Sequence, residues 1–480
     1  PTQAIRVRGG KAQIISERCI DCGECIRVCP HHAKKAGHDP FEMLKDFTYT
    51  VALPAPTLYG QFNHLDDIDI VLTGLKAIGF DDVFEVSRGA EIHSDLTRQL
   101  LGDGKLKKPA ISSACPAVVR LIRVDLCDHV LPLKAPMEIA ALLAREEAMK
   151  KTGLPSEQIG IFFLSPCAAK VTDVRVPIGI PHSNVDGVLS ISDLYPRLVS
   201  AMNHLDKVEP LARSGIIGVS WSSIGGEAAG LLNENHLAAD GIENVIQVLE
   251  ELEDEKLQEL DFIELNACAG GCVGGIFAAE NGYVARARIQ RLRKYLPVSC
   301  NRTEDAGCAE RLEWTDRLEF APVMKLAENV EDAMRLMERI DAISERLPQL
   351  DCGSCGAPTC RALADNLGGA FQSLGVGLVA LYGLNELIYR LTYRLAGNRT
   401  NLNDTAIFAQ MDAAPHMTFL VVVFLAPFVE EVLYRGLVFG NLRAKSRAVA
   451  YLISCALFAL AHVWQFAVSG GDVTYFWLMV

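Results

Sequence analysis

The sequence predicts an α/β protein that carries small metal-binding modules and is followed by an all-α transmembrane segment. Apolar runs of strand length, such as VALPAP, GIFFLS and SGIIGVS, alternate with helical stretches such as PMEIAALLAREEAMKKTG, which is the α/β pattern. Fifteen cysteines fall mostly in short clusters. Near residue 367 the composition changes abruptly, and long apolar segments replace the alternating pattern.

Length and charge indicate how many domains the chain has and which partners are excluded. The 480 residues are enough for about three domains with cores of their own. A net charge of −13 and the lack of a long basic run argue against a nucleic-acid partner. The first residues, PTQAIRVRGGKAQ, contain no apolar signal core, so we expect residues 1–366 to be cytoplasmic. In that reducing compartment, clustered thiols indicate metal binding rather than disulfides.

The first cysteine cluster, CIDCGECIRVCP, has the spacing C-x2-C-x2-C-x3-C-P. Its members are Cys19, Cys22, Cys25 and Cys29. This spacing is typical of a loop that wraps a 4Fe-4S cube, whereas a zinc site usually has two separated pairs. Residues 1–40 resemble a bacterial-type ferredoxin module. Because no second copy of the motif follows, either Cys29 closes the same cube or it pairs with thiols elsewhere.

Three separated central stretches, SSACPAVVRLI, FLSPCAAKVTD and ELNACAGGCVGG, together supply four thiols. These are Cys115, Cys167, Cys268 and Cys272. Pro116 suits the first turn of a helix, so we expect Cys115 at a helix N-terminus, where free N–H groups favour an anionic thiolate. A single buried cysteine is more often a small apolar residue. Four of them with these flanking sequences favour one cluster.

These three stretches resemble the signature segments of the iron-only (di-iron) hydrogenases, and the resemblance covers about residues 41–320. It implies a two-lobed domain in which the four central cysteines hold a 4Fe-4S cube. Cys272 would bridge the cube to a di-iron unit carrying CO and cyanide. Lys170 falls where the family has a lysine that contacts a cyanide ligand, whereas an unrelated lysine would be a solvated surface residue.

Three positions depart from the pattern of the efficient hydrogenases. Ala114 stands where those enzymes have a cysteine that relays protons, and Ser165 and Asn266 replace two methionines near the di-iron unit. The pattern is similar to the divergent, hydrogen-sensing branch of the family. It implies slow hydrogen oxidation or proton reduction, with a ferredoxin-like redox partner or a regulatory partner. An alternative is an iron–sulfur electron-transfer or assembly protein without the di-iron unit.

The third cluster, LDCGSCGAPTC, follows the predicted helix VEDAMRLMERIDAISERL. It places Cys352, Cys355 and Cys360 in the spacing C-x2-C-x4-C. Residues 325–366 resemble the small 4Fe-4S domain that accompanies such hydrogenases, but the stretch GGAFQSLGVG lacks that domain's fourth cysteine. Either another residue supplies the ligand, with Cys29, Cys300 or Cys308 as candidates, or the gene is interrupted here and another protein's end begins. The chain would therefore bind two to three clusters.

The C-terminal part, residues 367–480, is predicted to insert into a membrane. Its apolar segments, at roughly 369–389, 417–440 and 448–467, approach the ~20 residues that a helix needs to span a bilayer. Within them, APFVEEVLYRG carries three charged residues and SCALFALAHV carries a histidine. Ionisable residues inside apolar helices are functional candidates, although charges at a helix end would be a simpler explanation.

This set of residues resembles the CAAX-protease and bacteriocin-processing family of intramembrane proteases. The resemblance implies that Glu430 and His462 activate water, while Arg435 steadies the carboxylates of Glu430 and Glu431. A later His/Asn motif of that family does not occur before Val480, so we expect a truncated segment without proteolytic activity. The rival hypothesis is an active protease that the iron–sulfur clusters regulate.

Overall fold

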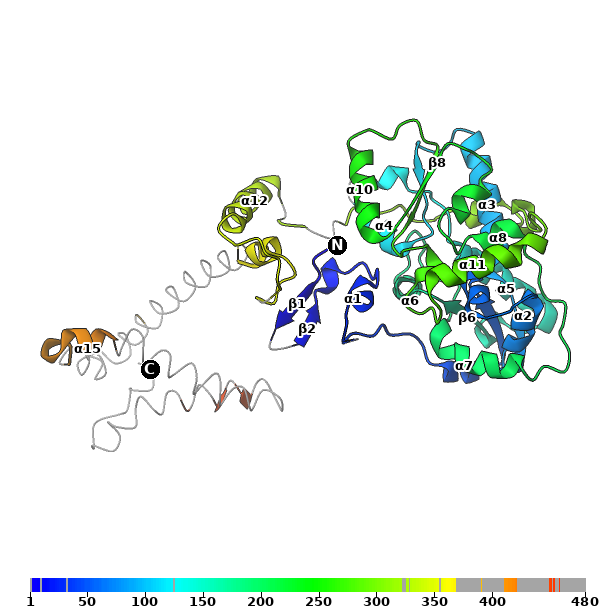
Figure 1. The fold of residues 1–480 in the computed structure, drawn as a ribbon, viewed down its shortest axis with the longest axis horizontal. Coiled ribbons are helices and arrows are strands. Elements are labelled where there is room, and N and C mark those ends of the chain that lie inside the picture. The colour runs from blue at the N-terminus through cyan, green and yellow to red at the C-terminus, as the bar shows by residue number, and fades with distance from the viewer. Residues whose placement is uncertain are drawn as a thin grey trace. The chain divides into compact units, whose positions relative to one another are not determined.

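The computed structural model describes most of residues 2–367 and short pieces of the rest. It omits residues 9–10, 32, 124–125, 322–324, 328 and 354, and beyond residue 367 it describes 390, 410–420, 449–450, 452–453 and 457. The chain divides into two compact units, Pro1–Asp365 and Asn366–Val480. The first unit contains two α/β lobes, which form the larger body in Figure 1, and two cysteine-rich segments, one at its N-terminal end and one at its C-terminal end.

The first lobe is built on a four-stranded parallel sheet with the order β4-β3-β6-β7. The strands are β3 (Tyr49–Pro54), β4 (Asp82–Val83), β6 (Ile159–Ser165) and β7 (Gly187–Ser190). One face packs on α3 (Val86–Gly102) and α5 (Pro136–Thr152), and the other packs on α2 (Ile68–Ala77), α7 (Ile191–Met202) and α11 (Gly282–Leu292). Both faces are buried, so VALPAP and GIFFLS read as continuous apolar runs, as expected for parallel strands.

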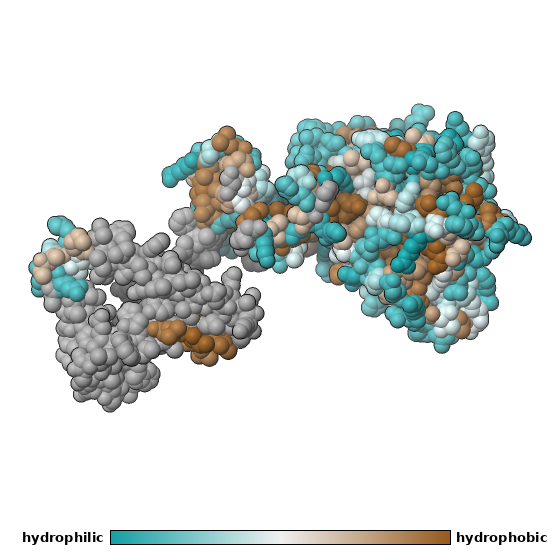
Figure 2. All heavy atoms as spheres, turned by 60° about the horizontal axis from the view of Figure 1, so that its bottom comes forward, coloured by the Kyte–Doolittle hydropathy of each residue, from teal (hydrophilic) through white to brown (hydrophobic). Residues whose placement is uncertain are grey.

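The second lobe is built on a three-stranded parallel sheet with the order β5-β9-β8. Its elements are β5 (Ala110–Ile111), α4 (Pro116–Ile122), α9 (Gly226–Gly230), β8 (His236–Asp240), α10 (Ile242–Glu253) and β9 (Phe262–Asn266). Apolar residues of α4, α10 and β9 form its main core. In Figure 1, α4, α10 and β8 lie in the upper half of the larger body, and β6, α2 and α7 lie in the lower half. The visible surface of this body is largely hydrophilic (Figure 2).

One predicted strand is wrong. The run SGIIGVS forms the short helix α8 (Ile216–Ser220) instead of a strand. Periodicity does not separate a short buried helix from a buried strand, and here the packing decides. α8 lies against α3 so closely that a Cβ on Gly218 would stand 2.2 Å from the carbonyl oxygen of Ser87.

The N-terminal module packs on both lobes. It consists of the hairpin β1 (Ile5–Arg8) and β2 (Lys11–Ile14), the cysteine loop, and the helical turn α1 (Glu24–Arg27). Ile20 of the cysteine loop is buried in the core of the second lobe. Gly23 has the left-handed φ of +77°, and a Cβ there would lie 2.7 Å from Ile276 Cγ2 in the loop after Cys272. The module is therefore seated on the segment that carries two of the central cysteines.

The third cysteine cluster follows α12 (Val330–Ser344), and residues 360–367 are helical. This loop is attached to the N-terminal hairpin. The backbone N–H of Val7 donates to the carbonyl of Gly356 at 2.7 Å. Arg18 forms an ion pair with Asp365 at 2.6 Å. The two cysteine-rich ends of the first unit therefore lie side by side.

The predicted membrane segments fall almost entirely outside the described residues. α15 (Pro415–Leu420) contains the beginning of the segment 417–440. Within the part of the chain that the structure describes, no helix combines the length and the apolar character needed to cross a bilayer.

Candidate metal centre

The four central cysteines line one cavity at the carboxyl ends of strands from both lobes. Cys115 follows β5, Cys167 follows β6, and Cys268 and Cys272 follow β9. All four cysteines are among the residues that line this cavity. Binding sites in α/β proteins commonly lie at this end of the strands, because the loops that follow the strands meet there.

Two of the thiols stand at helix starts. Cys115 directly precedes α4, whose first residue is Pro116, as the sequence predicted. Cys167 directly precedes α6 (Ala168–Arg175), a position that the sequence analysis did not assign. The free N–H groups and the dipole of a helix N-terminus favour negative charge, so both positions suit thiolates that bind a metal.

The glycines between Cys268 and Cys272 allow the loop to bend tightly. Gly270 and Gly271 have φ values of +84° and +89°, which residues with a side chain rarely adopt. A Cβ on Gly271 would also lie 2.5 Å from the backbone nitrogen of Ile224. This tight loop brings both cysteines to the same cavity.

The protein around three of the four thiols favours their neutral form. Burial, together with the charge of the neighbouring thiols, raises the pKa of Cys167 to about 11 and that of Cys268 to about 12. Burial of the thiol and the neighbouring thiols also raise the pKa of Cys272 well above its usual value. Bound iron would supply the charge that makes four adjacent thiolates stable.

Four cysteines are the donor set that an iron–sulfur cube takes. Among the described residues, no group of three or more His, Cys, Asp or Glu side chains is close enough to share one metal ion. In a 4Fe-4S cube four Cys thiolates hold the cluster, and the central cavity is lined by four cysteines. The donor set and the cavity therefore fit an iron–sulfur cube.

Lys170 points to the same cavity. It lies on α6 and lines the cavity, and its side chain is only 11% exposed. Its Nζ atom pairs with Asp173 at 3.3 Å. Its positive charge acts on Cys167 and Cys272 and opposes the rise in their pKa. Lys170 is therefore not a solvated surface residue.

The three positions that differ from the efficient hydrogenases have different surroundings. Ala114 and Asn266 both line the cavity. Ser165 does not belong to the cavity lining. Its hydroxyl accepts from the N–H of Cys167 and donates to the carbonyl of Cys167, each at 3.0 Å. Ser165 therefore shapes the turn that carries Cys167.

Arg27 is a site residue that the sequence analysis missed. Its Nη2 donates to the carbonyl of Gly274 at 3.2 Å, and its guanidinium is also paired with Glu24. Its charge and hydrogen bond act on Cys268 and lower that thiol's pKa against the effect of burial. The sequence offered no signal beyond the position of Arg27 inside the first cysteine motif. Arg27 thus joins the N-terminal module to the central site.

The other cysteines are distributed as follows. Cys19, Cys22 and Cys25 line one pocket, which Pro358 of the third cluster also lines, and burial raises the pKa of Cys19 to about 11. Cys29 is not among these lining residues, and it accepts from the N–H of Ala33 at 3.5 Å. Cys360 is half-buried, whereas Cys300, Cys308, Cys352 and Cys355 are exposed.

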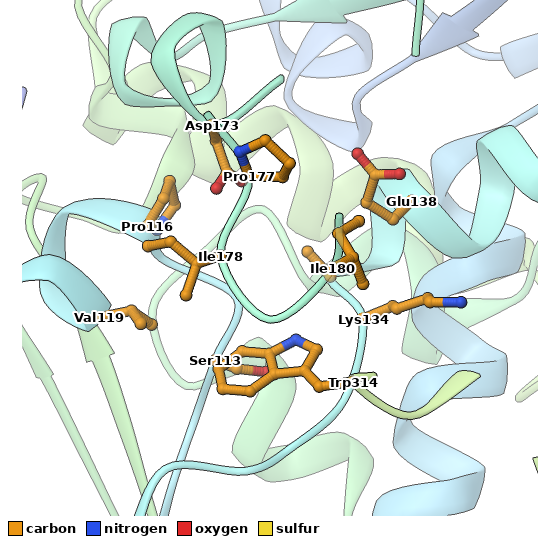
Figure 3. A pocket seen from close by; sticks show the side chains of 11 residues that line it. Ser113, Pro116, Val119, Lys134, Glu138, Asp173, Pro177, Ile178, Ile180 and Trp314 are labelled. Atoms are coloured by element: carbon orange, nitrogen blue, oxygen red, sulfur yellow. The ribbon is translucent and has the colours of Figure 1, made fainter. Parts of the chain in front are cut away.

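A smaller pocket adjoins the cavity at Pro116, which lines both. Figure 3 shows Lys134, Glu138 and Asp173 around it, with Trp314 on the side opposite Asp173. Because Asp173 also pairs with Lys170, this polar pocket is linked to the cavity through one ion pair.

The expected protease residues, Glu430, Glu431, Arg435 and His462, all lie outside the described residues.

Four family models match parts of the chain. Residues 48–226 and 220–276 match the family described as the iron only hydrogenase large subunit, C-terminal domain. Residues 12–35 match the 4Fe-4S binding domain, and residues 347–368 match a family described as an Fe-S cluster. Residues 412–480 match the type II CAAX prenyl endopeptidase Rce1-like family.

Individual relatives share only a low sequence identity with the chain. The NADP-reducing hydrogenase subunit HndD of Solidesulfovibrio fructosivorans is 26% identical over 212 residues, which make up 38% of this chain and 36% of that protein. The chain thus spans about a third of the length of this curated relative. A variant of the FeFe hydrogenase HydA1 from Chlamydomonas reinhardtii aligns with a TM-score of 0.43 and 15% identity, over 55% of this chain and 88% of that chain. A variant of apo HydA1 aligns with a TM-score of 0.42 and 15% identity, over 57% and 95%.

These matches confirm the resemblance to iron-only hydrogenases that the three central cysteine segments indicated. The 4Fe-4S motif at the N-terminus and the resemblance of the C-terminal part to CAAX proteases are confirmed as well. The chain is a hydrogenase-like iron–sulfur protein, and its cofactors are 4Fe-4S clusters.

Proposed function

We propose that the central cavity carries out slow hydrogen oxidation or proton reduction, at a rate suited to hydrogen sensing or regulation. One observation carries this proposal. Four cysteines from three separate segments line a cavity with a buried lysine, and the position next to Cys115 holds an alanine. The thiols and the lysine fit a cube with an attached di-iron unit, and the alanine gives no proton.

The residues of the cavity would have separate roles. Cys115, Cys167, Cys268 and Cys272 would hold the cube, with Cys272 as the bridging ligand. Lys170 would place a positive charge beside a cyanide ligand. When bound, the di-iron unit would supply the metal chemistry of hydrogen. The apolar wall, which includes Val86, Met137 and Phe163, would keep water away from the site.

Electrons would reach the cavity through the cysteine-rich ends. The loop of the third cluster contacts the N-terminal hairpin, and the first cysteine motif contacts the loop of Cys268 and Cys272 through Arg27 and Gly23. This continuous set of contacts would connect an external ferredoxin-like redox partner, or a regulatory partner, to the central site.

Infrared spectroscopy of anaerobically matured protein tests the proposal. Carbonyl and cyanide bands would support a di-iron unit. Cube signals in electron paramagnetic resonance without those bands would instead support the alternative, an electron-transfer or assembly protein that holds cubes alone. A well-folded protein that takes up zinc and no sulfide would refute both.

A second candidate function, proteolysis in a membrane, is favoured by the match of residues 412–480 to the CAAX prenyl endopeptidases. In that case Glu430 and His462 would activate water, Arg435 would steady the carboxylates of Glu430 and Glu431, and the clusters would regulate cleavage. A membrane reporter that is cleaved by the full chain, and no longer cleaved after Glu430→Ala or His462→Ala, would establish it. The genomic sequence across residues 360–380 would show whether the two parts form one gene.

A further inference from the structure

Two positively charged side chains act on the central cysteines, and they come from different parts of the chain. Lys170 belongs to the wall of the central cavity, and its charge acts on Cys167 and Cys272. Arg27 belongs to α1 of the N-terminal module and is not among the residues that line the cavity, and its charge acts on Cys268. A cube bound by these cysteines would therefore have one cation from the cavity wall and one from the N-terminal module.

The guanidinium of Arg27 is fixed by two partners. Nη1 pairs with the carboxylate of Glu24 in the first turn of α1. Nη2 donates to the carbonyl of Gly274 at 3.2 Å, in the turn that begins at Cys272. The side chain is 29% exposed, so solvent screens its charge only in part. Because a guanidinium stays protonated in proteins, Arg27 holds a permanent positive charge at the loop that carries Cys268 and Cys272.

The helix α6 forms part of the wall of both cysteine sites. Three of its residues line the pocket of the N-terminal cysteines, namely Ala168, Val171 and Thr172. Lys170 of the same helix lines the central cavity, and Cys167 directly precedes the helix. Two cubes bound at these sites would therefore be neighbours, with α6 in the wall of each.

Acidic side chains lie at the N-terminal cysteines. Asp21 Oδ1 accepts from the thiol of Cys19 at 3.5 Å. The charges of Asp21 and Glu24 act on Cys25. Two cations offset part of this negative charge: Lys34 and Arg120. The N-terminal site is therefore mixed in charge, whereas the two cations described above act on the central one.

Charge near a cube changes how readily that cube is reduced. Reduction adds one negative charge to the cube, so a nearby cation stabilises the reduced form and a nearby carboxylate destabilises it. For one partly exposed cation we expect an effect on the order of tenfold in the equilibrium of a one-electron couple, which corresponds to about 59 mV. The charges of this chain therefore favour an electron on the central cube over one on the N-terminal cube.

We propose that Arg27 directs electrons from the N-terminal cube to the central cube, because its fixed charge beside Cys268 stabilises the reduced central cube. An electron supplied by a ferredoxin-like partner moves from the reduced N-terminal cube, which becomes oxidised, to the central cube, which becomes reduced. Arg27 gains and loses neither an electron nor a proton. Because it acts through Cys268, it is a positioning residue. The proposal adds a preferred direction of electron transfer to the proposed function, and it rests on the two cubes rather than on the di-iron unit.

Redox titration of the full chain tests this proposal. The chain is reconstituted anaerobically with iron and sulfide, so that it carries cubes and no di-iron unit, and electron paramagnetic resonance follows each cube. The signal that Cys272→Ala removes identifies the central cube. Arg27→Gln should lower the reduction potential of that cube by about 59 mV, which is tenfold in its equilibrium, whereas Arg27→Lys keeps the charge and should stay close to wild type. An unchanged potential in Arg27→Gln, or the same potential in both variants, would overturn the proposal.

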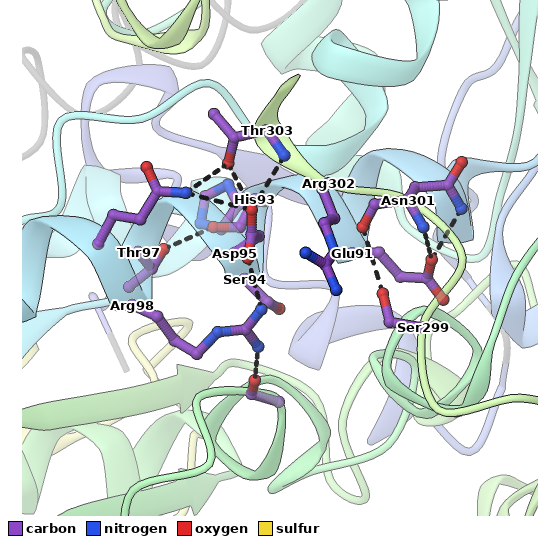
Figure 4. Close-up of polar contacts among 12 residues, drawn as sticks. Glu91, His93, Ser94, Asp95, Thr97, Arg98, Ser299, Asn301, Arg302 and Thr303 are labelled. Carbon is purple, nitrogen blue, oxygen red and sulfur yellow. Dashed lines mark hydrogen bonds and ion pairs between the residues drawn. The ribbon is translucent and has the colours of Figure 1, made fainter. Parts of the chain in front are cut away.

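Arg98→Gln is a matched control. Like Arg27, Arg98 pairs with an acid three residues earlier in its helix, Asp95, and donates to the carbonyl of another element, that of Gly230 at 2.6 Å (Figure 4). Its side chain is 27% exposed, and it does not line the central cavity. The control loses an arginine with the same kinds of contact and should keep the wild-type potential. A shift as large as that of Arg27→Gln would overturn the proposal.

A second measurement separates the effect of charge from a loss of docking. Hydrogen exchange of residues 16–30 should stay at the wild-type level in Arg27→Gln, because Gly23 still packs on Ile276 and Asp21 still pairs with Arg120. A potential shift that comes with lost protection would overturn the proposal, since undocking would then explain the shift.

Glu24→Gln serves if Arg27→Gln fails to fold or to bind cubes. This variant removes the carboxylate that pairs with Arg27, so the potential of the central cube should rise. An unchanged potential would overturn the proposal. Missing carbonyl and cyanide bands after maturation would count against the proposed function alone, because the titration uses protein that carries only cubes.

Discussion

Substitution of Gly23 by alanine should detach the N-terminal module from the central loop. Gly23 has a φ of +77°, which costs a residue with a side chain about 1–2 kcal/mol. The new Cβ would lie 2.7 Å from Ile276 Cγ2 and 3.3 Å from Ile276 Cδ1, and such overpacking costs about 1–3 kcal/mol. The two effects together destabilise the docked state by about 2–5 kcal/mol. Since 1.4 kcal/mol is about tenfold in an equilibrium constant, the docked population should fall by more than about tenfold relative to the undocked one.

Hydrogen exchange of the backbone amides of residues 16–30 measures this docking directly. Protection should fall in Gly23→Ala and stay at the wild-type level in the matched control Gly37→Ala, because a Cβ on Gly37 would meet no atom within 4 Å. Adding Ile276→Ala should recover the part of the loss that comes from overpacking, but not the part that comes from the backbone. Equal protection in Gly23→Ala and Gly37→Ala would refute the docking described for this module.

Four further predictions concern the clusters, the cavity wall, a buried carboxylate and the C-terminal part of the chain. Anaerobically reconstituted protein comprising residues 1–365 should bind at least two cubes, and Cys272→Ala should remove the central one while the ferredoxin-type signal remains; iron analysis and electron paramagnetic resonance check this. Ala114→Cys should raise the hydrogen turnover of matured protein, because a thiol would restore an acid in the cavity wall; a wild-type rate already equal to that of fast hydrogenases would contradict it. Folding raises the pKa of Glu264 from 4.5 to about 7, so the protonated side chain stabilises the folded state fully below about pH 4.5, and this stabilisation is lost as the pH rises through about 7. The melting temperature of the apo protein should fall over this pH range, and Glu264→Gln should make it depend less on pH. The full chain should partition to membranes without cleaving a reporter, which cell fractionation and a cleavage assay check. Cleavage by the full chain that is lost in Glu430→Ala would contradict this prediction.

Local features of the site followed from the sequence because they depend on neighbours in the chain. The ligand spacing of the first cysteine cluster and the helix start after Cys115 are set within a few residues. The same holds for α5 and for the buried strands β3 and β6, whose apolar runs are long enough to be recognised. The run SGIIGVS was too short for its period to decide, and its close packing on α3 made it a helix.

The tertiary structure alone decided which distant residues meet. Lys170 is identified as a cavity residue by the packing of α6, and Ser165 turns to the backbone of Cys167 although its position in the sequence pointed to the cavity. Arg27 reaches the loop of Cys268 from a motif far away in the chain.

The same is true of Glu227 and His93, which ordinary sequence analysis would pass over as a helical acid and a core histidine. Glu227 Oε1 lies 3.9 Å from His93 Nε2 because α9 packs against α3. Spacing along the chain determines which groups can bind a metal within one loop. Burial and the meeting of separate loops determine their protonation, and these arise only when the two lobes close around one cavity.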